Sequence, residues 1–264
     1  MKSKCNALNE LFANKKSNIL SVYFTAGFPK LDSTVEVITN LVKNGTDIIE
    51  IGIPFSDPVA DGPIIQKSNT VALKNGMSLS LLFDQLSGIK EKIKVPLILM
   101  GYFNPVLQYG IERFCKKCQE IGIDGVIIPD LSFDIYRKKY KHIFQEFNVH
   151  FIFLVTPQTS NERMLEIDNE TSGFIYAVST SSTTGMKDDF SNEHEEYFKR
   201  LKNLNLKHPF LIGFGISNYK TYSKACNYAN GVIIGSAFIK ALGENNELLE
   251  EKISKFIRMI KSNN

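Results

Sequence analysis

Short apolar stretches alternate with helical stretches along the chain, and this alternation restricts the possible folds more than any other feature. Eight stretches have the apolar, β-branched composition of buried strands. They cover residues 19–25, 48–53, 96–100, 125–128, 150–155, 173–178, 209–213 and 231–234. The segments between them carry apolar residues at helical spacing, so the sequence predicts parallel strands joined by covering helices.

Eight strand and helix units within 264 residues fit a closed (β/α)8 TIM barrel better than an open doubly wound sheet. Further helices are predicted at 6–15, before the first strand, and after the last strand through Ile260. No flexible linker divides the chain, so residues 1–264 are expected to form a single domain. The predicted fold class is therefore α/β, a single TIM barrel with extra N-terminal and C-terminal helices.

An isolated carboxylate marks the second predicted strand, residues 48–53. Glu50 shares one face of that strand only with Gly52, while isoleucines occupy the other face. The acid therefore stands beside a residue without a side chain, which suggests a gap for a ligand. Asp57 and Asp61 follow in a loop rich in proline and glycine, a kind of loop that holds side chains over a site.

Other polar residues also follow predicted strands, where the carboxyl ends of barrel strands form active sites. Together with Glu50 and Asp61, they are Tyr102, Asn104, Asp130 and Thr156. Segments rich in glycine and hydroxyl groups follow strands six, seven and eight, at 179–185, 213–217 and 235–236. The segments after strands seven and eight could be simple tight turns, and 179–185 could equally be a mobile lid. Their joint position favours a phosphorylated small-molecule substrate, because barrels bind phosphate there and a helix starting near Ser236 would present free N–H groups.

Composition excludes several other classes of protein. Hydrophobic residues make up 43% and charged residues 22%, with no apolar run long enough for a membrane span, so no membrane association is predicted. A net charge of +3 with scattered lysines and arginines does not favour nucleic-acid binding. The N-terminal residues lack the apolar core of a signal peptide, and a cytoplasmic location is expected.

No metal site is predicted. The only closely spaced cysteine pair is Cys115 and Cys118, and both fall on the apolar side of a helical pattern, which favours a structural role over zinc or redox chemistry. The four histidines are scattered, without another candidate ligand at metal-binding spacing.

The segment PFSDPVADGPIIQ, preceded by IIEIG, closely resembles the signature of the tryptophan synthase α subunit family. The remaining strand ends agree in order, and the resemblance covers essentially the whole chain. The agreeing segments are YFTAGFP, LMGYFNP, GVIIPDL, GFIYAVS, GFGIS and VIIGSA.

This resemblance implies a lyase that cleaves indole-3-glycerol phosphate to indole and glyceraldehyde 3-phosphate, without metal or organic cofactor. Glu50 would be the catalytic acid and base, and Asp61 would hold the indole N–H and stabilise positive charge on the ring. Burial should raise the pKa of Glu50, whereas the polar loop should keep Asp61 ionised. The residues implied for substrate binding are Tyr23 and Tyr176 at the indole, with Thr184, Gly185, Gly215, Gly235 and Ser236 toward the phosphate.

The sequence departs from the family pattern at two places. Ser132 stands where the family commonly has proline, which should alter only the stiffness of that loop. The run after Ser179 holds only serine and threonine where many members carry arginine and glycine, and this affects the expected closure of the 179–189 lid.

The resemblance also implies a partner, a tryptophan synthase β subunit that uses pyridoxal phosphate, in an αββα heterotetramer. Residues 54–62 and 104–110 would meet it, with Val106 and Leu107 exposed, although a loop packed on its own barrel is nearly as well supported by composition. One alternative is a weakly catalytic barrel that mainly activates the β subunit. Another is a related phosphate-binding barrel isomerase, which leaves the ADGP motif unexplained.

Overall fold

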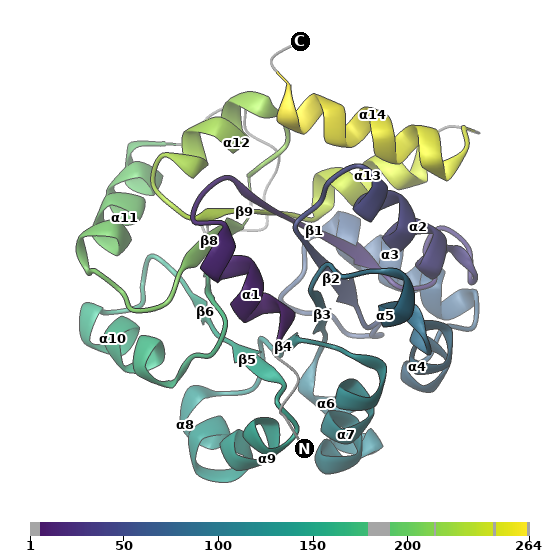
Figure 1. Ribbon diagram of the computed structural model, residues 1–264, viewed down its shortest axis with the longest axis horizontal. Coiled ribbons are helices and arrows are strands. Elements are labelled where there is room, and N and C mark those ends of the chain that lie inside the picture. Colours follow the sequence, from purple (N-terminus) through teal and green to yellow (C-terminus); the bar gives the residue numbers. More distant parts are fainter. Residues whose placement is uncertain (1–5, 179–190, 214, 245–246, 263–264) are drawn as a thin grey trace.

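All strands belong to one parallel sheet that curves around a central axis, with helices on the outside (Figure 1). The computed structural model describes residues 6–178, 191–213, 215–244 and 247–262. The strands are β1 (Ile19–Thr25), β2 (Ile48–Gly52), β3 (Leu97–Met100), β4 (Gly125–Ile127), β5 (His150–Ile152), β6 (Leu154–Val155), β7 (Ile175–Val178), β8 (Phe210–Gly213) and β9 (Gly231–Ile234). Their spatial order is β5-β4-β3-β2-β1-β9-β8-β7-β6.

The two end strands of this order, β5 and β6, come from the single strand predicted at 150–155. They are consecutive in the chain and separated by Phe153 alone. Strand β5 pairs with β4, and β6 pairs with β7. The Phe153 carbonyl accepts a 2.9 Å hydrogen bond from the Tyr176 N–H, so backbone pairing continues across the break. The sheet thus closes on itself with eight strand positions, and the predicted TIM barrel is confirmed.

The helices cover the barrel in the predicted sequence of units, with two additions. They are α1 (Ala7–Asn14), α2 (Ser33–Lys43), α3 (Pro63–Lys74), α4 (Leu79–Leu86), α5 (Ile89–Lys92), α6 (Phe103–Tyr109), α7 (Ile111–Ile121), α8 (Phe133–Ile135), η1 (Tyr136–Tyr140), α9 (Lys141–Glu146), α10 (Asn161–Glu170), α11 (Asn192–Asn203), α12 (Tyr219–Cys226), α13 (Ser236–Gly243) and α14 (Leu249–Lys261). Helix α6 occupies a segment expected to be loop, and helix α3 occupies a segment for which the sequence predicts no element. Helix α3 starts with Pro63, whose fixed φ and missing N–H suit the first helical position.

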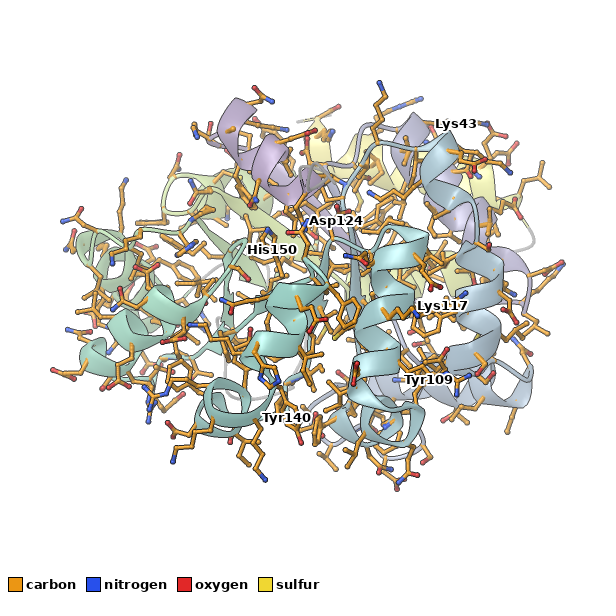
Figure 2. All side chains as sticks on the ribbon, turned by 60° about the horizontal axis from the view of Figure 1, so that its bottom comes forward. Lys43, Tyr109, Lys117, Asp124, Tyr140 and His150 are labelled. Carbon is orange, nitrogen blue, oxygen red and sulfur yellow. The ribbon has the colours of Figure 1, made fainter. Side chains whose placement is uncertain are left out.

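Helix α1 crosses one end of the barrel axis in Figure 1 and closes that end. The Asn6 side chain caps α1 by accepting from the Leu8 N–H, and it donates a 2.8 Å hydrogen bond to the Asp124 carbonyl. Leu8 is fully buried among the inward side chains of the strands. Figure 2 shows Asp124 and His150 toward this end, where strands begin. An open active site must therefore lie at the other end.

The side chains of β2 alternate as predicted. Ile49 and Ile51 pack in the large core between the sheet and the helices, whereas Ile48 packs in the smaller core inside the barrel. Glu50 lies on the same inward face as Ile48, because successive side chains of a strand point to opposite sides. Within the described residues, no helix is both long and apolar enough to cross a membrane.

Candidate active site

Glu50 lies on the inner wall of the barrel and is 0% exposed. In the sheet register it stands opposite Tyr23 on β1 and Ile98 on β3. The Ser21 hydroxyl donates a 2.6 Å hydrogen bond to Glu50 Oε1. The second oxygen, Oε2, is buried and has no hydrogen-bond partner in the described part of the chain. A buried polar atom without a partner is rare in folded proteins and calls for a functional explanation.

Burial raises the pKa of Glu50 to about 7, because the charged form is poorly solvated inside the barrel, and the hydrogen bond from Ser21 acts in the opposite direction. The carboxyl group is thus poised between its two protonation states near neutral pH. A group poised in this way can both release and take up a proton, as general acid–base catalysis requires.

Asp61 lies in the loop after β2, and burial raises its pKa to about 6. The environment is thus less polar than the sequence suggests. Tyr102, from the loop after β3, forms a hydrogen bond with Asp61 that lowers this pKa. The Tyr102 hydroxyl oxygen also accepts a 2.9 Å hydrogen bond from the Ala60 N–H, and its ring stacks on Phe55 at 5.2 Å between centroids. Tyr102 therefore fixes the Asp61 loop, and the Asp61 pKa remains below that of Glu50.

The space beside Glu50 is occupied, contrary to the prediction of a gap at Gly52. A Cβ at Gly52 would overlap the Tyr23 ring, and a Cβ at Gly213 on β8 would overlap the Tyr176 ring. Both glycines are therefore needed to admit a tyrosine from the neighbouring strand. The barrel end that holds Glu50 is lined by phenol rings, and both phenols are buried.

The two tyrosines and the two carboxyl groups form one electrostatic cluster. Burial is the largest cause of the raised pKa of Tyr23, and the charge of Asp61 is the second. The pKa of Tyr176 is raised by burial first and then by the charges of Glu50 and Asp61. Both tyrosines thus lie within electrostatic range of Glu50 and Asp61.

The predicted phosphate-binding residues lie on the neighbouring strands. Gly215 follows β8 in a turn with a φ of 75°, where glycine is favoured. Gly235 caps α13, which begins at Ser236, and a Cβ on Gly235 would lie 3.3 Å from Cδ1 of Tyr23. The start of α13 thus adjoins the tyrosine that faces Glu50. Thr184, Gly185 and the predicted 179–189 lid lie outside the described residues.

Other residues noted in the sequence have different surroundings. Asp57 is exposed and accepts a 2.5 Å hydrogen bond from the Ser56 hydroxyl, so it does not join the cluster. Asp130 accepts a 2.8 Å hydrogen bond from the Phe103 N–H and holds the start of α6. Ser132 caps α8 by accepting from the Ile135 N–H, a role that proline could not fill.

Two expectations about apolar side chains have different outcomes. Cys115 and Cys118 are fully buried on α7, which confirms their predicted place on the apolar side of that helix, and burial raises the pKa of Cys115 to about 12. Val106, in contrast, was expected to be exposed and is fully buried, because α6 turns it toward the core. Among the described residues there is no group of three or more potential metal ligands.

Sequence reasoning found Tyr23 on β1 but missed Ser21 and Thr25, the hydroxyl residues on either side of it on the same strand face. All three are buried, and Thr25 hydrogen-bonds at 2.6 Å to Ser68 on α3. The signal was present as hydroxyl residues at every second position of the strand sequence ILSVYFT. Alternation of this kind marks a strand face that is buried but polar.

A TIM barrel that buries a carboxyl group with a pKa of about 7 near the carboxyl ends of its strands has the arrangement typical of barrel enzymes. A sequence profile of the tryptophan synthase alpha chain matches residues 9–263. The tryptophan synthase alpha chain of Flavobacterium johnsoniae is 58% identical over 92% of this chain and 95% of its own length. That of Bacteroides thetaiotaomicron is 52% identical over 92% and 94%.

Solved structures agree with these relatives. A structure of Mycobacterium tuberculosis tryptophan synthase has a TM-score of 0.85 and 30% identity, covering 97% of this chain and 95% of that chain. The tryptophan synthase A-subunit of Pyrococcus furiosus has a TM-score of 0.85 and 33% identity, covering 93% and 98%. The chain belongs to the tryptophan synthase alpha chain family and is a lyase of tryptophan biosynthesis.

Proposed function

We propose that Glu50 and Asp61 are the catalytic pair with which this chain cleaves indole-3-glycerol phosphate to indole and glyceraldehyde 3-phosphate. The observation that carries the assignment is the state of Glu50. It is fully buried at the wall of the barrel, one of its oxygens has no partner among the described residues, and its pKa is raised to about 7.

The reaction requires that one proton be added to carbon 3 of the indole ring and that another be removed from the glycerol hydroxyl. Protonated Glu50 gives its proton to carbon 3 of the indole ring, whose electron pair forms the new C–H bond and leaves positive charge on the ring nitrogen. The Glu50 carboxylate then takes the proton of the glycerol hydroxyl next to the ring. The O–H electron pair becomes the carbonyl of glyceraldehyde 3-phosphate, and the breaking C–C bond returns its pair to the ring. Glu50 finishes protonated, as it began.

Asp61 stabilises the positively charged intermediate. A carboxylate that accepts the indole N–H is best placed to stabilise the positive charge that forms on the ring nitrogen. For this role Asp61 must be ionised while Glu50 is protonated. The pKa values of about 6 and about 7 favour this distribution, and the hydrogen bond from Tyr102 supports it by lowering the pKa of Asp61.

Tyr23 and Tyr176 would contact the indole ring, and the start of α13 at Ser236 would receive the phosphate. Unpaired N–H groups and the positive end of the helix dipole favour an anion there. Gly215 and Gly235 would permit close backbone approach, and Thr184 and Gly185 would complete the phosphate site. The proximity of Gly235 to Tyr23 supports binding of both ends of one small substrate.

We also propose that the chain works with a tryptophan synthase β subunit in an αββα assembly. Two apolar side chains at the active-site end of the barrel support an interface there. Val59, in the Asp61 loop, is 85% exposed, and Leu107 on α6 is 47% exposed.

As a biosynthetic lyase acting on a phosphorylated metabolite, the chain is assigned to the cytoplasm. Its single continuous barrel supports one domain over 1–264.

The test is release of indole from indole-3-glycerol phosphate by the purified chain. We expect Glu50→Gln and Asp61→Asn each to reduce turnover at least about a thousandfold, while their far-ultraviolet circular dichroism spectra stay unchanged. Normal turnover by either variant would contradict its assigned role.

The same variants separate this proposal from the alternative of a mainly activating partner. Addition of a β subunit with serine allows the β reaction to be followed in the presence of Glu50→Gln. If the inactive variant activated the β subunit fully while the unaltered chain released indole only at a trace rate, activation would be the main role.

A further inference from the structure

The two carboxyl oxygens of Glu50 have different surroundings, because only one of them accepts a hydrogen bond from Ser21. Oε1 accepts from the Ser21 hydroxyl at 2.6 Å, and Oε2 is buried without a partner in the described part of the chain. Both residues belong to the inner wall of the barrel, on neighbouring strands β1 and β2, and both are 0% exposed. The contact is therefore shielded from competing water.

A serine hydroxyl has a single hydrogen, and this limits where Glu50 can carry its own proton. Among the described residues, Glu50 Oε1 is the only hydrogen-bond partner of the Ser21 hydroxyl. Protonation on Oε1 would reverse the contact, with Glu50 donating its proton to the Ser21 oxygen, and the proton would then be held by the serine. Protonation on Oε2 keeps Ser21 as the donor to Oε1 and leaves the Glu50 proton without a protein partner in the described residues, so that it is free for transfer to a substrate.

We propose that Ser21 is a positioning residue that keeps the transferable proton of Glu50 on Oε2 and thereby makes Oε2 the oxygen that exchanges protons with the substrate. This inference rests on the proposed role of Glu50. It adds that β1 supplies the group that selects the reactive oxygen. Oε1 is held by the serine, and Oε2 takes part in proton transfer.

None of the other titratable groups around Glu50 hydrogen-bonds to its carboxyl group in the described part of the chain. Tyr23 faces Glu50 from β1, Tyr176 from β7 and Asp61 from the loop after β2. The charge of Asp61 opposes ionisation of its neighbours, and the pKa values of both tyrosines are raised, so they stay neutral. Of the groups affecting Glu50, Ser21 alone stabilises its carboxylate form.

The experiment compares the unaltered full-length chain with Ser21→Ala and Ser21→Cys, whose thiol is of similar size but a weak donor. Thr46→Val is the matched control, because Thr46 has a buried hydroxyl without a partner in the described residues and lies outside the site. The pKa of Glu50 is read directly from the infrared carbonyl band of its protonated form, assigned by its loss in Glu50→Gln. Indole release gives kcat and KM separately.

We expect Ser21→Ala to raise the pKa of Glu50 by about one unit and to lower kcat about tenfold, with KM changed less than about twofold. Ser21→Cys should fall between Ser21→Ala and the unaltered chain, and Thr46→Val should match the unaltered chain. A purely structural serine would change thermal stability without moving the carbonyl band.

The outcomes keep this inference separate from the proposed function. If Glu50→Gln is inactive but Ser21→Ala leaves both the Glu50 pKa and kcat unchanged, the positioning role of Ser21 is wrong and the catalytic role of Glu50 stands. If Glu50→Gln keeps normal turnover, the proposed function fails, and with it the catalytic meaning of the Ser21 contact.

Discussion

The Tyr23 ring occupies the space beside Gly52, so that a Cβ at position 52 would lie 2.7 Å from Cζ and 2.9 Å from Cε2 of that ring. We therefore predict that Gly52→Ala displaces Tyr23 from its place opposite Glu50. Overpacking of this kind costs about 1–3 kcal/mol of unfolding free energy, and indole release should fall about tenfold or more because the site loses its shape. Urea denaturation and the indole assay measure the two effects.

The control for this clash is the double variant Gly52→Ala with Tyr23→Phe. Loss of the phenol oxygen, the Tyr23 atom nearest to position 52, should recover part of the lost stability, so the two substitutions should not be additive. An unfolding free energy of Gly52→Ala within roughly 0.5 kcal/mol of the unaltered chain, with full turnover, would show that the ring has room to move.

The second prediction concerns the pH dependence of indole release. Asp61, with a pKa of about 6, must be ionised, and Glu50, with a pKa of about 7, must be protonated. Activity should therefore rise as the pH passes 6 and fall as it passes 7, which gives a narrow bell in kcat/KM. Because the two carboxyl groups interact, the two limbs of the bell give apparent pKa values that belong to the pair and not to either residue alone. A flat profile between pH 5.5 and 8.5 would contradict both protonation states.

Tyr102→Phe should move one limb of that bell alone. It removes the hydrogen bond that lowers the pKa of Asp61, so the acid limb should shift to higher pH while the basic limb stays. Tyr140→Phe on η1 is the matched control and should leave both limbs in place. An equal shift of both limbs in Tyr102→Phe would indicate a general disturbance of the barrel.

The difference between what the sequence predicts and what the structure contains lies mainly in side-chain packing between strands. Alternation along residues 48–53 correctly places Glu50 on the inner wall, because the period of a strand fixes its faces. The same alternation cannot show which neighbouring side chain fills the space at Gly52, since that depends on the register between β1 and β2. The burial that raises the pKa of Asp61 was missed for a similar reason, because it depends on which parts of the chain pack against the Asp61 loop.

The unpredicted helices have a local cause. The segment containing α3 begins with proline and glycine residues that favour a loop, and Pro63 is compatible with a helix only as its first residue. In α6, Pro105 lies in the first turn, where its missing N–H leaves no helical hydrogen bond unmade. Both helices start next to the active site, where turn residues and helix starts coincide in the sequence.

The third prediction concerns how the unfolding free energy depends on pH through the protonation of Glu50. Its pKa rises from 4.5 to about 7 on folding, so the native state binds the proton more tightly than the unfolded chain. The stabilisation is fully present below pH 4.5 and is lost as the pH rises through 7. Relative to Glu50→Gln, the unaltered chain should therefore lose about 2 kcal/mol of unfolding free energy between pH 5.5 and 8.5.

Glu36→Gln serves as the control for this comparison, because Glu36 is an exposed residue on α2 and its removal should not change the pH dependence. Urea denaturation at the two pH values provides all the unfolding free energies. If Glu50→Gln followed the pH dependence of the unaltered chain, Glu50 would not carry the raised pKa in solution.

The fourth prediction addresses the proposed β-subunit interface. Leu107 is 47% exposed on α6, and Leu165 on α10 is 43% exposed, so the two leucines match in type and exposure. Leu107 lies on the helix that begins directly after Tyr102, the residue that contacts the Asp61 loop, whereas Leu165 lies on the helix that follows β6. Leu107→Asp should weaken binding of a β subunit at least about tenfold, because it brings an unpaired charge into an apolar contact, whereas Leu165→Asp should not.

Binding is measured by titrating each variant against a β subunit and following activation of the β reaction. Indole release by the isolated chain should remain unchanged in both variants, since neither leucine belongs to the cluster around Glu50. Equal weakening by Leu107→Asp and Leu165→Asp would remove α6 from the interface. Weakening by Leu107→Asp alone would place the β subunit over the end of the barrel where Glu50 and Asp61 lie, as transfer of indole between two subunits requires.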